Sequence, residues 1–199
     1  MRPTIEDLQS IWLFTYSRSA FIEAEDSLDE LRNVPSESLQ YRALVAAAIT
    51  AYMQPFTPCF IPPNRKVIPF KDVPIPEHLA RFHEDAMNLR DTMIGHMDAT
   101  PADGYTASPN IVTIRICPDN RFILHSATIG EMEPESKNGL LQLCGFFRKY
   151  CNENLSRLTK ACRSALMKHG PGQYELVISE PPADWLIPFR IKHGEDFRK

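Results

Sequence analysis

Apolar residues recur at intervals of three and four along the amino-terminal part of the chain, and this spacing predicts two α-helices. The first covers residues 5–31 and follows Thr4, a favourable N-cap, with Asp7 three positions later. The second covers residues 38–52 and is apolar nearly all round, which is typical of a helix with neighbours on most sides. Because only the short segment NVPSES separates them, the two helices are expected to pack antiparallel.

The same spacing predicts two more helices further along the chain. The third covers residues 76–96 and begins at Pro76, a residue favoured in a first helical turn. The fourth, which is the longest, covers residues 137–167. The expected buried stripes are Leu79, Phe82, Ala86, Leu89 and Met93 in the third helix, and Leu140, Cys144, Phe147, Cys151, Leu155, Leu158 and Cys162 in the fourth. The sequence therefore predicts a mainly α protein, a four-helix up-and-down bundle formed by one domain over residues 1–199.

Short β-rich runs interrupt and follow the helices. NIVTIRIC and RFILHSATI predict a β-hairpin insertion at about residues 110–129. YELVISE and WLIPFRI predict a carboxy-terminal β extension at about 173–192, and the pattern leaves open whether its strands join the hairpin. Six prolines from Pro58 to Pro76 exclude a continuous helix or a central strand there. The apolar residues of this passage favour an ordered loop on the core: Phe56, Phe60, Ile61, Val67, Ile68 and Phe70.

Composition narrows the functional classes. The formal net charge of −3 disfavours a protein that holds long duplex nucleic acid by bulk attraction. Five cysteines without a Cys-x-x-Cys pair are better explained as core thiols in a reducing compartment than as disulfides or a zinc site. No apolar run is long enough to cross a bilayer and the amino terminus does not resemble a signal peptide, so a cytoplasmic protein is expected.

No cofactor or metal is expected from the motifs. The chain has no glycine-rich phosphate loop, no nucleophile elbow and no dinucleotide fingerprint. The run His83, Glu84 and Asp85 is interpreted as a solvated polar face rather than a metal site, because its helical spacing does not supply two strong ligands. Cys59, in the proline-rich passage, is only a weak candidate for a nucleophile.

The segment NLRDTMIGHMDA, residues 88–99, gathers residue types that suit RNA cleavage. Arg90 is a permanent cation with a planar donor fork suited to phosphate, His96 can exchange a proton near neutral pH, and Asp91 can hold either group in place. An arginine and a histidine that converge on one phosphodiester are sufficient for cleavage without a metal ion.

The helical geometry of this segment is less favourable. At about 100° per residue, Arg90 and His96 lie roughly 120° apart around the helix and roughly 9 Å apart along it. They can converge if Gly95 loosens the last turn, or if two subunits each contribute one of them. A purely structural explanation also stands, since an Arg–Asp pair and a histidine at a helix C-terminus stabilise many helices.

The same residues resemble the signature of HEPN-domain proteins, an arginine and a histidine separated by four to six residues; here five residues separate Arg90 from His96. The earlier segment ITAYMQPFT is similar to the one that precedes this signature in a group of bacterial HEPN-like proteins, with Gln54 where arginine is expected. The resemblance spans about residues 39–99. The hairpin and the carboxy-terminal strands lie outside the family core.

The resemblance implies a homodimer whose motif helices face each other across a shared cleft. It further implies a metal-independent ribonuclease, often a toxin or defence protein with a possible antitoxin partner, in which Arg90 binds phosphate, His96 is the general acid or base and Asp91 orients them. Arg65, Lys66 and Lys71 form a basic patch that could guide RNA, although a solvated loop is the commoner explanation. Because some members are catalytically silent, a non-catalytic helical dimerisation or binding module is the alternative.

Overall fold

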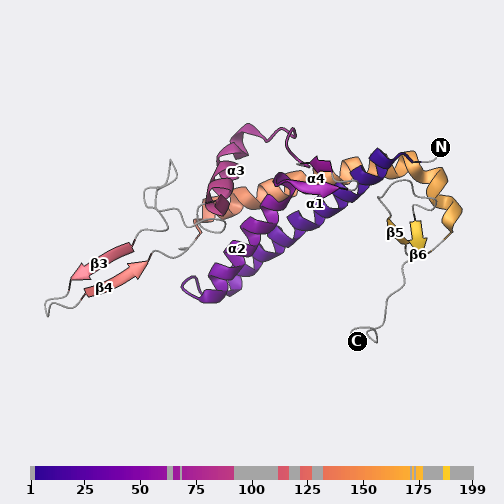
Figure 1. Cartoon of the computed structure of the whole chain (residues 1–199). Helices are drawn as coiled ribbons and strands as arrows, with labels where there is room; N and C mark the ends of the chain where they lie inside the picture. The colour runs from indigo at the N-terminus through magenta and orange to yellow at the C-terminus, as the bar shows by residue number, and fades with distance from the viewer. Residues whose placement is uncertain are drawn as a thin grey trace, which may run out of the picture.

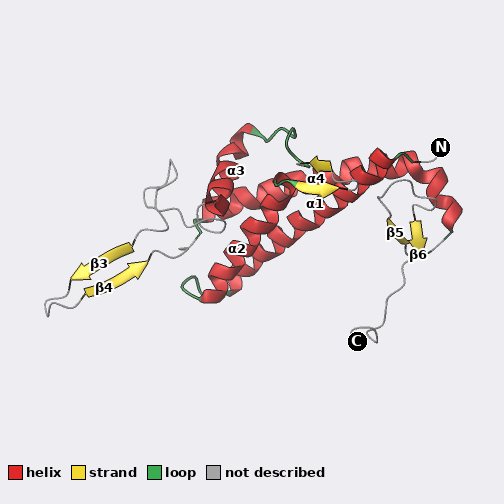
Figure 2. Cartoon of the chain, viewed as in Figure 1, coloured by secondary structure: helices red, strands yellow, loops and turns green. Residues whose placement is uncertain are grey.

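The computed structural model describes residues 3–61, 65–67, 69–91, 112–116, 122–126, 132–170, 172, 174–176 and 186–188. Within these residues the chain is mainly α-helical, as predicted, and four α-helices carry the fold (Figures 1 and 2). They are α1 (Ile5–Glu30), α2 (Leu39–Met53), α3 (Glu77–Leu89) and α4 (Pro134–Leu166). The long helices α1 and α4 lie side by side, and the shorter α2 and α3 cover part of that pair.

The described strands form three separate antiparallel hairpins. β1 (Cys59–Ile61) pairs with β2 (Arg65–Val67), β3 (Val112–Ile116) with β4 (Phe122–Ser126), and β5 (Tyr174–Leu176) with β6 (Leu186–Pro188). The predicted hairpin insertion between the third and fourth helices is thus confirmed, with Ile114 opposite Leu124. The carboxy-terminal strands pair with each other and not with that hairpin.

Polar side chains fix the ends of the first two helices. The Thr4 hydroxyl accepts a hydrogen bond from the backbone N–H of Asp7 at 3.1 Å, and the Asp7 carboxylate accepts one from the backbone N–H of Thr4 at 3.0 Å. This reciprocal capping box satisfies two N–H groups that a helix N-terminus otherwise leaves unpaired. Ser38 caps α2 in the same way, by accepting from the backbone N–H of Tyr41 at 3.0 Å. The predicted Thr4 cap is confirmed.

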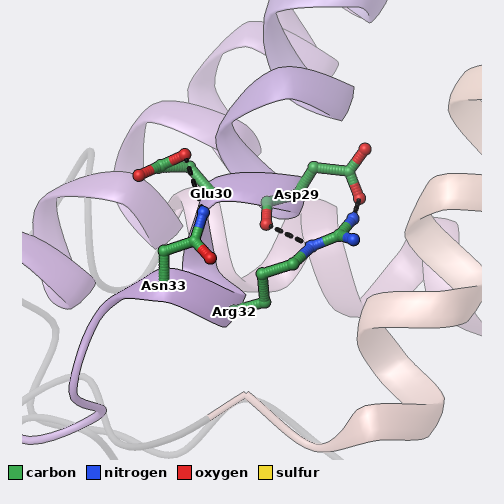
Figure 3. A network of polar contacts seen from close by, with 4 residues as sticks. All are labelled: Asp29, Glu30, Arg32 and Asn33. Carbon is green, nitrogen blue, oxygen red and sulfur yellow. Dashed lines mark hydrogen bonds and ion pairs between the residues drawn. The ribbon is translucent and has the colours of Figure 1, made fainter.

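A small exposed network closes the other end of α1, where a 3₁₀ turn covers Leu31–Asn33 (Figure 3). Arg32 forms an ion pair with the Asp29 carboxylate and donates from Nε to the Asp29 carbonyl at 2.9 Å. Asn33 donates to the Glu30 carboxylate at 3.2 Å. Each contact joins residues three positions apart and is exposed to solvent. The network therefore ends the helix but contributes little to the free energy of folding.

Contacts between residues distant in sequence show that α1 runs antiparallel to both α4 and α2. Between α1 and α4, Glu25 forms an ion pair with Arg148 at 2.7 Å while the earlier Arg18 contacts the later Asn152. Between α1 and α2, Tyr16 donates a hydrogen bond to Gln54 at 3.1 Å. The predicted antiparallel packing of the first two helices is therefore confirmed.

Aromatic rings fill the core where α2 and α3 cover the long pair. Phe21, Tyr52, Phe70 and Phe147 are almost completely buried, and the Phe21 and Phe147 rings stack with their centroids 5.3 Å apart. Phe56 joins them edge to face at 5.1 Å from Phe147. Offset and edge-to-face pairs of this kind add to the burial of apolar area, so the cluster ties all four helices and the proline-rich passage together.

The structure places Phe70 on the core, as predicted, but Phe60 is not where we expect it, and the side chains of Ile61, Val67 and Ile68 lie outside the described part of the chain. Phe70 is buried and Phe56 is partly buried against the core, whereas Phe60 is 70% exposed. The expectation that Phe60 lies on the core is wrong because this residue is in strand β1. Successive side chains of a strand point to opposite faces, so Phe60 points away from the face that half-buries Cys59.

Candidate functional site

Helix α3 is held against the beginning of α4 by an unusually close approach. A Cβ atom placed on Gly139 of α4 would lie 2.3 Å from the Phe82 ring of α3, so no larger residue fits there without movement. Leu79 and Ala86 are buried on the same side of α3. This packing fixes the direction of α3, whose last turn ends beside the beginning of α4 (Figure 1).

Arg90 and Asp91 lie in that last turn, which widens into a π-type turn at residues 90 and 91. The backbone N–H of Arg90 contacts the carbonyls of both Ala86 and Met87. The Arg90 Nε donates a hydrogen bond to Asp91 Oδ1 at 2.7 Å, and a terminal guanidinium nitrogen lies 2.5 Å from the same oxygen. The sequence therefore predicted correctly that these two residues act as a pair.

The exposure of the pair suits a group that meets a ligand at the surface. The Arg90 side chain is 27% exposed and that of Asp91 is 50% exposed. Arg90 follows His83 by seven residues, so at about 100° per residue it lies within roughly 20° of the packed side of α3. Asp91 occupies two of the five N–H donors that a guanidinium carries. A planar cation at this position can bind one phosphate oxygen pair while the carboxylate keeps its plane fixed.

His83 is the functional-type residue that sequence reasoning missed. Its interpretation as part of a solvated polar face is wrong, because His83 is 7% exposed and its Nδ1 shares a 2.8 Å hydrogen bond with the Tyr52 hydroxyl. Burial lowers the pKa of His83, and the charge of Glu84 partly opposes this. Burial also raises the pKa of Tyr52 well above its ordinary value. The available signal was helical spacing: His83 comes four residues after Leu79 and three before Ala86, on the packed side.

Of the other predicted site residues, only Lys71 has a described side chain, and it lies apart from Arg90. His96 lies outside the described residues, as does the rest of its segment from residue 92 onward. Arg65 and Lys66 lie in β2, where the structure describes the backbone alone. Lys71 is exposed and follows Phe70, whose ring packs against Tyr150, about 25 Å along α4 from the end near Arg90. Lys71 and Arg90 therefore lie at different places on the protein.

The structure explains Gln54, which departs from the HEPN pattern, and Cys59, the weak candidate for a nucleophile. Gln54, where arginine is expected from the HEPN resemblance, accepts the hydrogen bond from Tyr16 and so joins α2 to α1. Cys59 has a pKa raised by burial, which opposes formation of the reactive thiolate. The predicted core thiols Cys144, Cys151 and Cys162 are buried, which confirms their place on the packed stripe of α4.

Metal-binding clusters and membrane-spanning helices are two further features that bear on the function. In the part of the chain that the structure describes, no three His, Cys, Asp or Glu side chains are grouped so that they could hold a metal ion. None of the described helices combines the length and the apolar content that crossing a bilayer requires. No protein-family model, no curated protein and no solved structure matches this chain.

Proposed function

We propose that this chain is an HEPN-like, metal-independent ribonuclease whose active site lies at the end of α3. The observation that carries the proposal is the Arg90–Asp91 pair, in which a guanidinium that is 27% exposed is held by its neighbouring carboxylate at the end of the third helix of a mainly α fold. The position of Arg90 at the end of the third helix supports the proposal, because the resemblance implies a motif late in a helix.

The proposed reaction needs one stabilised phosphorane and two proton transfers, one from the 2′-hydroxyl and one to the leaving 5′-oxygen; His96 performs one of them and solvent water the other. The 2′-hydroxyl attacks the adjacent phosphorus, a bond from O2′ to phosphorus forms, and the bond to the 5′-oxygen breaks. His96 accepts the 2′-hydroxyl proton or donates a proton to the leaving 5′-oxygen, and Arg90 stabilises the charge on the equatorial oxygens. The products are a 2′,3′-cyclic phosphate and a 5′-hydroxyl, so the chemistry needs no metal ion or external reactant.

The direct test is cleavage of single-stranded RNA in excess chelator. We expect the wild-type chain to leave 2′,3′-cyclic phosphate ends, and Arg90→Ala or His96→Ala to reduce the rate at least 100-fold, a typical loss for a charge-stabilising or acid–base group. Matched controls come from the same helix: Arg81 also pairs with an aspartate, Asp85, at 3.8 Å, and His78 is exposed in the first turn. Cleavage that survives Arg90→Ala and His96→Ala as well as it survives Arg81→Ala and His78→Ala would rule out the proposal.

A second experiment tests whether the site is shared between two copies of the chain. If Arg90 of one subunit works with His96 of the other, then mixing the two inactive variants gives mixed dimers with one intact site each. Random exchange makes half of the dimers mixed, so about one quarter of the wild-type activity should return. If both residues act within one chain, mixing restores nothing and the homodimer is not needed for catalysis.

The alternative is a non-catalytic binding module in which Arg90 and Asp91 form a structural pair. The observation that favours it is the neutralisation of a mostly buried guanidinium by the adjacent carboxylate. The two functions predict different effects of Asp91→Asn, measured as affinity for an uncleavable RNA strand and as stability in urea. A binding Arg90 should keep or gain affinity when its competitor carboxylate is removed, whereas a structural pair should only lose stability.

A further inference from the structure

The second half of α4 carries a row of cations that the proposed active site does not use. Residues 155–170 contain four Lys and Arg and no Asp or Glu. Without these four, the chain has 18 Lys and Arg against 25 Asp and Glu, so the remainder is clearly acidic. The four side chains all belong to exposed residues: Arg157, Lys160, Arg163 and Lys168. We call this set the α4 basic row.

The basic row lies on the side of α4 that faces away from the protein. Leu158, Cys162 and Ala165 are buried in this half of the helix. At about 100° per residue, the mean direction of these three is roughly 170° from that of Arg157, Lys160 and Arg163. The row from Arg157 to Lys168 is about 16 Å long. Arg157, Lys160 and Arg163 therefore form one outward face and do not take part in packing, and Lys168 extends the row into the 3₁₀ turn Met167–His169.

Several of the other surface cations have acidic partners. Among the ion pairs of the described residues, Arg32 pairs with Asp29, Arg81 with Asp85 and Lys149 with Glu153, whereas no member of the row takes part in one. The hydrogen bond that Arg157 donates to Asn154 at 3.2 Å is to a neutral amide. The row thus keeps its positive charge available to an external anion.

The shape of the row decides which kind of anion it suits. A cationic helix can bind an anionic membrane when its apolar face is free to enter the bilayer. Here the apolar face of α4 is already packed, with Ala165 and Leu8 of α1 in one buried cluster. A one-sided line of cations without an apolar face matches the phosphate backbone of a nucleic acid, where each Lys or Arg displaces counterions.

We propose that the α4 basic row binds the backbone of the RNA substrate, an inference that rests on the proposed ribonuclease function. Arg157 lies 23 residues after Pro134, about 35 Å along α4 from the end beside Arg90. A stacked strand advances about 3.4 Å per nucleotide, so about ten nucleotides separate the two points. The substrate class is single-stranded RNA of more than about ten nucleotides, and shorter strands reach one of the two points only.

The test compares two triple variants that change the net charge equally. One is Arg157→Gln with Lys160→Gln and Arg163→Gln in the basic row. The other, the control, is Arg32→Gln with Arg81→Gln and Lys149→Gln, each of which has an acidic partner. Glutamine is a good helix former, and circular dichroism verifies that both variants keep their helices. Binding is measured by fluorescence anisotropy with a labelled, fully 2′-O-methylated strand of about thirty nucleotides, which cannot be cleaved.

Each phosphate contact contributes about −0.7 to the slope of log affinity against log salt for single strands, so three contacts contribute about −2.1. The row variant should lack these three contacts, so its slope should be less steep by about 2.1. Between 50 and 200 mM salt, the affinity of the wild type should therefore decrease by a factor about twenty times larger than that of the row variant. The control variant should keep the wild-type slope. Equal slopes for the row variant and the wild type would overturn the proposal, as would an equal change in the control variant.

Two more outcomes separate this proposal from others. Because the strand cannot be cleaved, this assay does not depend on ribonuclease activity. A slope change in the row variant therefore supports RNA binding by the basic row even if cleavage assays rule out the proposed ribonuclease function. If the row variant instead loses binding to vesicles of anionic phospholipid and binds RNA as the wild type does, the row is a membrane surface and the proposal is wrong.

Discussion

Replacing Tyr52 by phenylalanine removes one hydroxyl from the centre of the bundle and leaves every ring contact in place. The lost 2.8 Å hydrogen bond leaves Nδ1 of His83 without this partner at a residue that is 7% exposed. When a buried polar group loses its hydrogen-bond partner, the free energy of unfolding decreases by about 1–3 kcal/mol. For a chain of this size, a loss of about 2 kcal/mol lowers the melting temperature by roughly 4–8 °C.

The control for this variant is Tyr16→Phe. Tyr16 also donates a hydrogen bond from a helix, to Gln54 at 3.1 Å, but it is 41% exposed, so water replaces the lost partner. We expect its cost in urea denaturation to stay within about 0.5 kcal/mol. The reasoning is refuted if Tyr52→Phe destabilises the chain no more than Tyr16→Phe.

The same buried pair predicts how stability depends on pH. Burial lowers the pKa of His83 below 6.5 in the folded chain, so between that value and 6.5 the unfolded chain binds more protons. The contribution of His83 to the free energy of unfolding is therefore fully present above about pH 7.5. It decreases as the pH falls through 6.5, by at most about 1.4 kcal/mol per pH unit. Glu25 and Asp85, whose pKa values burial raises, change stability in the opposite direction. The contribution of His83 is the part of the slope that disappears in His83→Gln, and an unchanged slope in that variant would contradict it.

Three further predictions concern packing, capping and thiols. Gly139→Ala should cost about 1–3 kcal/mol in urea denaturation because its Cβ would overlap the Phe82 ring, and adding Phe82→Ala should recover part of the loss. Thr4→Ala should cost about 1 kcal/mol through loss of the capping box, measured in the same way, and no loss would show that the start of α1 frays. Burial raises the pKa of Cys151 to about 12 and raises that of Cys144 further, so neither thiol should react with a disulfide reagent at about pH 8 until the chain unfolds; fast labelling of the native protein would contradict this.

The helices could be predicted from sequence because their signals are local. Spacing of three and four residues, together with caps at Thr4 and Ser38, determines where α1 and α2 begin whatever packs against them. Long-range pairing has no such signal, and the pattern could not decide whether Tyr174–Leu176 joins Val112–Ile116. Phe60 was misplaced for a related reason, since its apolar character does not show which face of a short strand it occupies.

The candidate site was predictable in part. Adjacent residues such as Arg90 and Asp91 are close in any backbone conformation, so their pairing follows from the sequence. The Tyr52–His83 hydrogen bond joins residues 31 positions apart, and Glu84 and Asp85 next to the histidine give the segment a polar appearance. Only the packing of α3 on α2 shows that one residue of this polar run is buried.

The unequal lengths of the helices divide the molecule into two ends with different physical properties. α1 and α4 contain 26 and 33 residues, about 39 and 50 Å, whereas α2 and α3 contain 15 and 13, about 22 and 20 Å. The short helices can therefore cover one end only, which holds the aromatic core and Arg90. The other end has the small cluster around Leu8 and Ala165, and it also carries the α4 basic row. Like charges three residues apart destabilise a helix by a few tenths of a kcal/mol, and here little apolar burial offsets that repulsion. An anion that binds the row in the folded chain would remove the repulsion, so the proposed RNA binding at this end predicts a more stable α1–α4 pair in the complex.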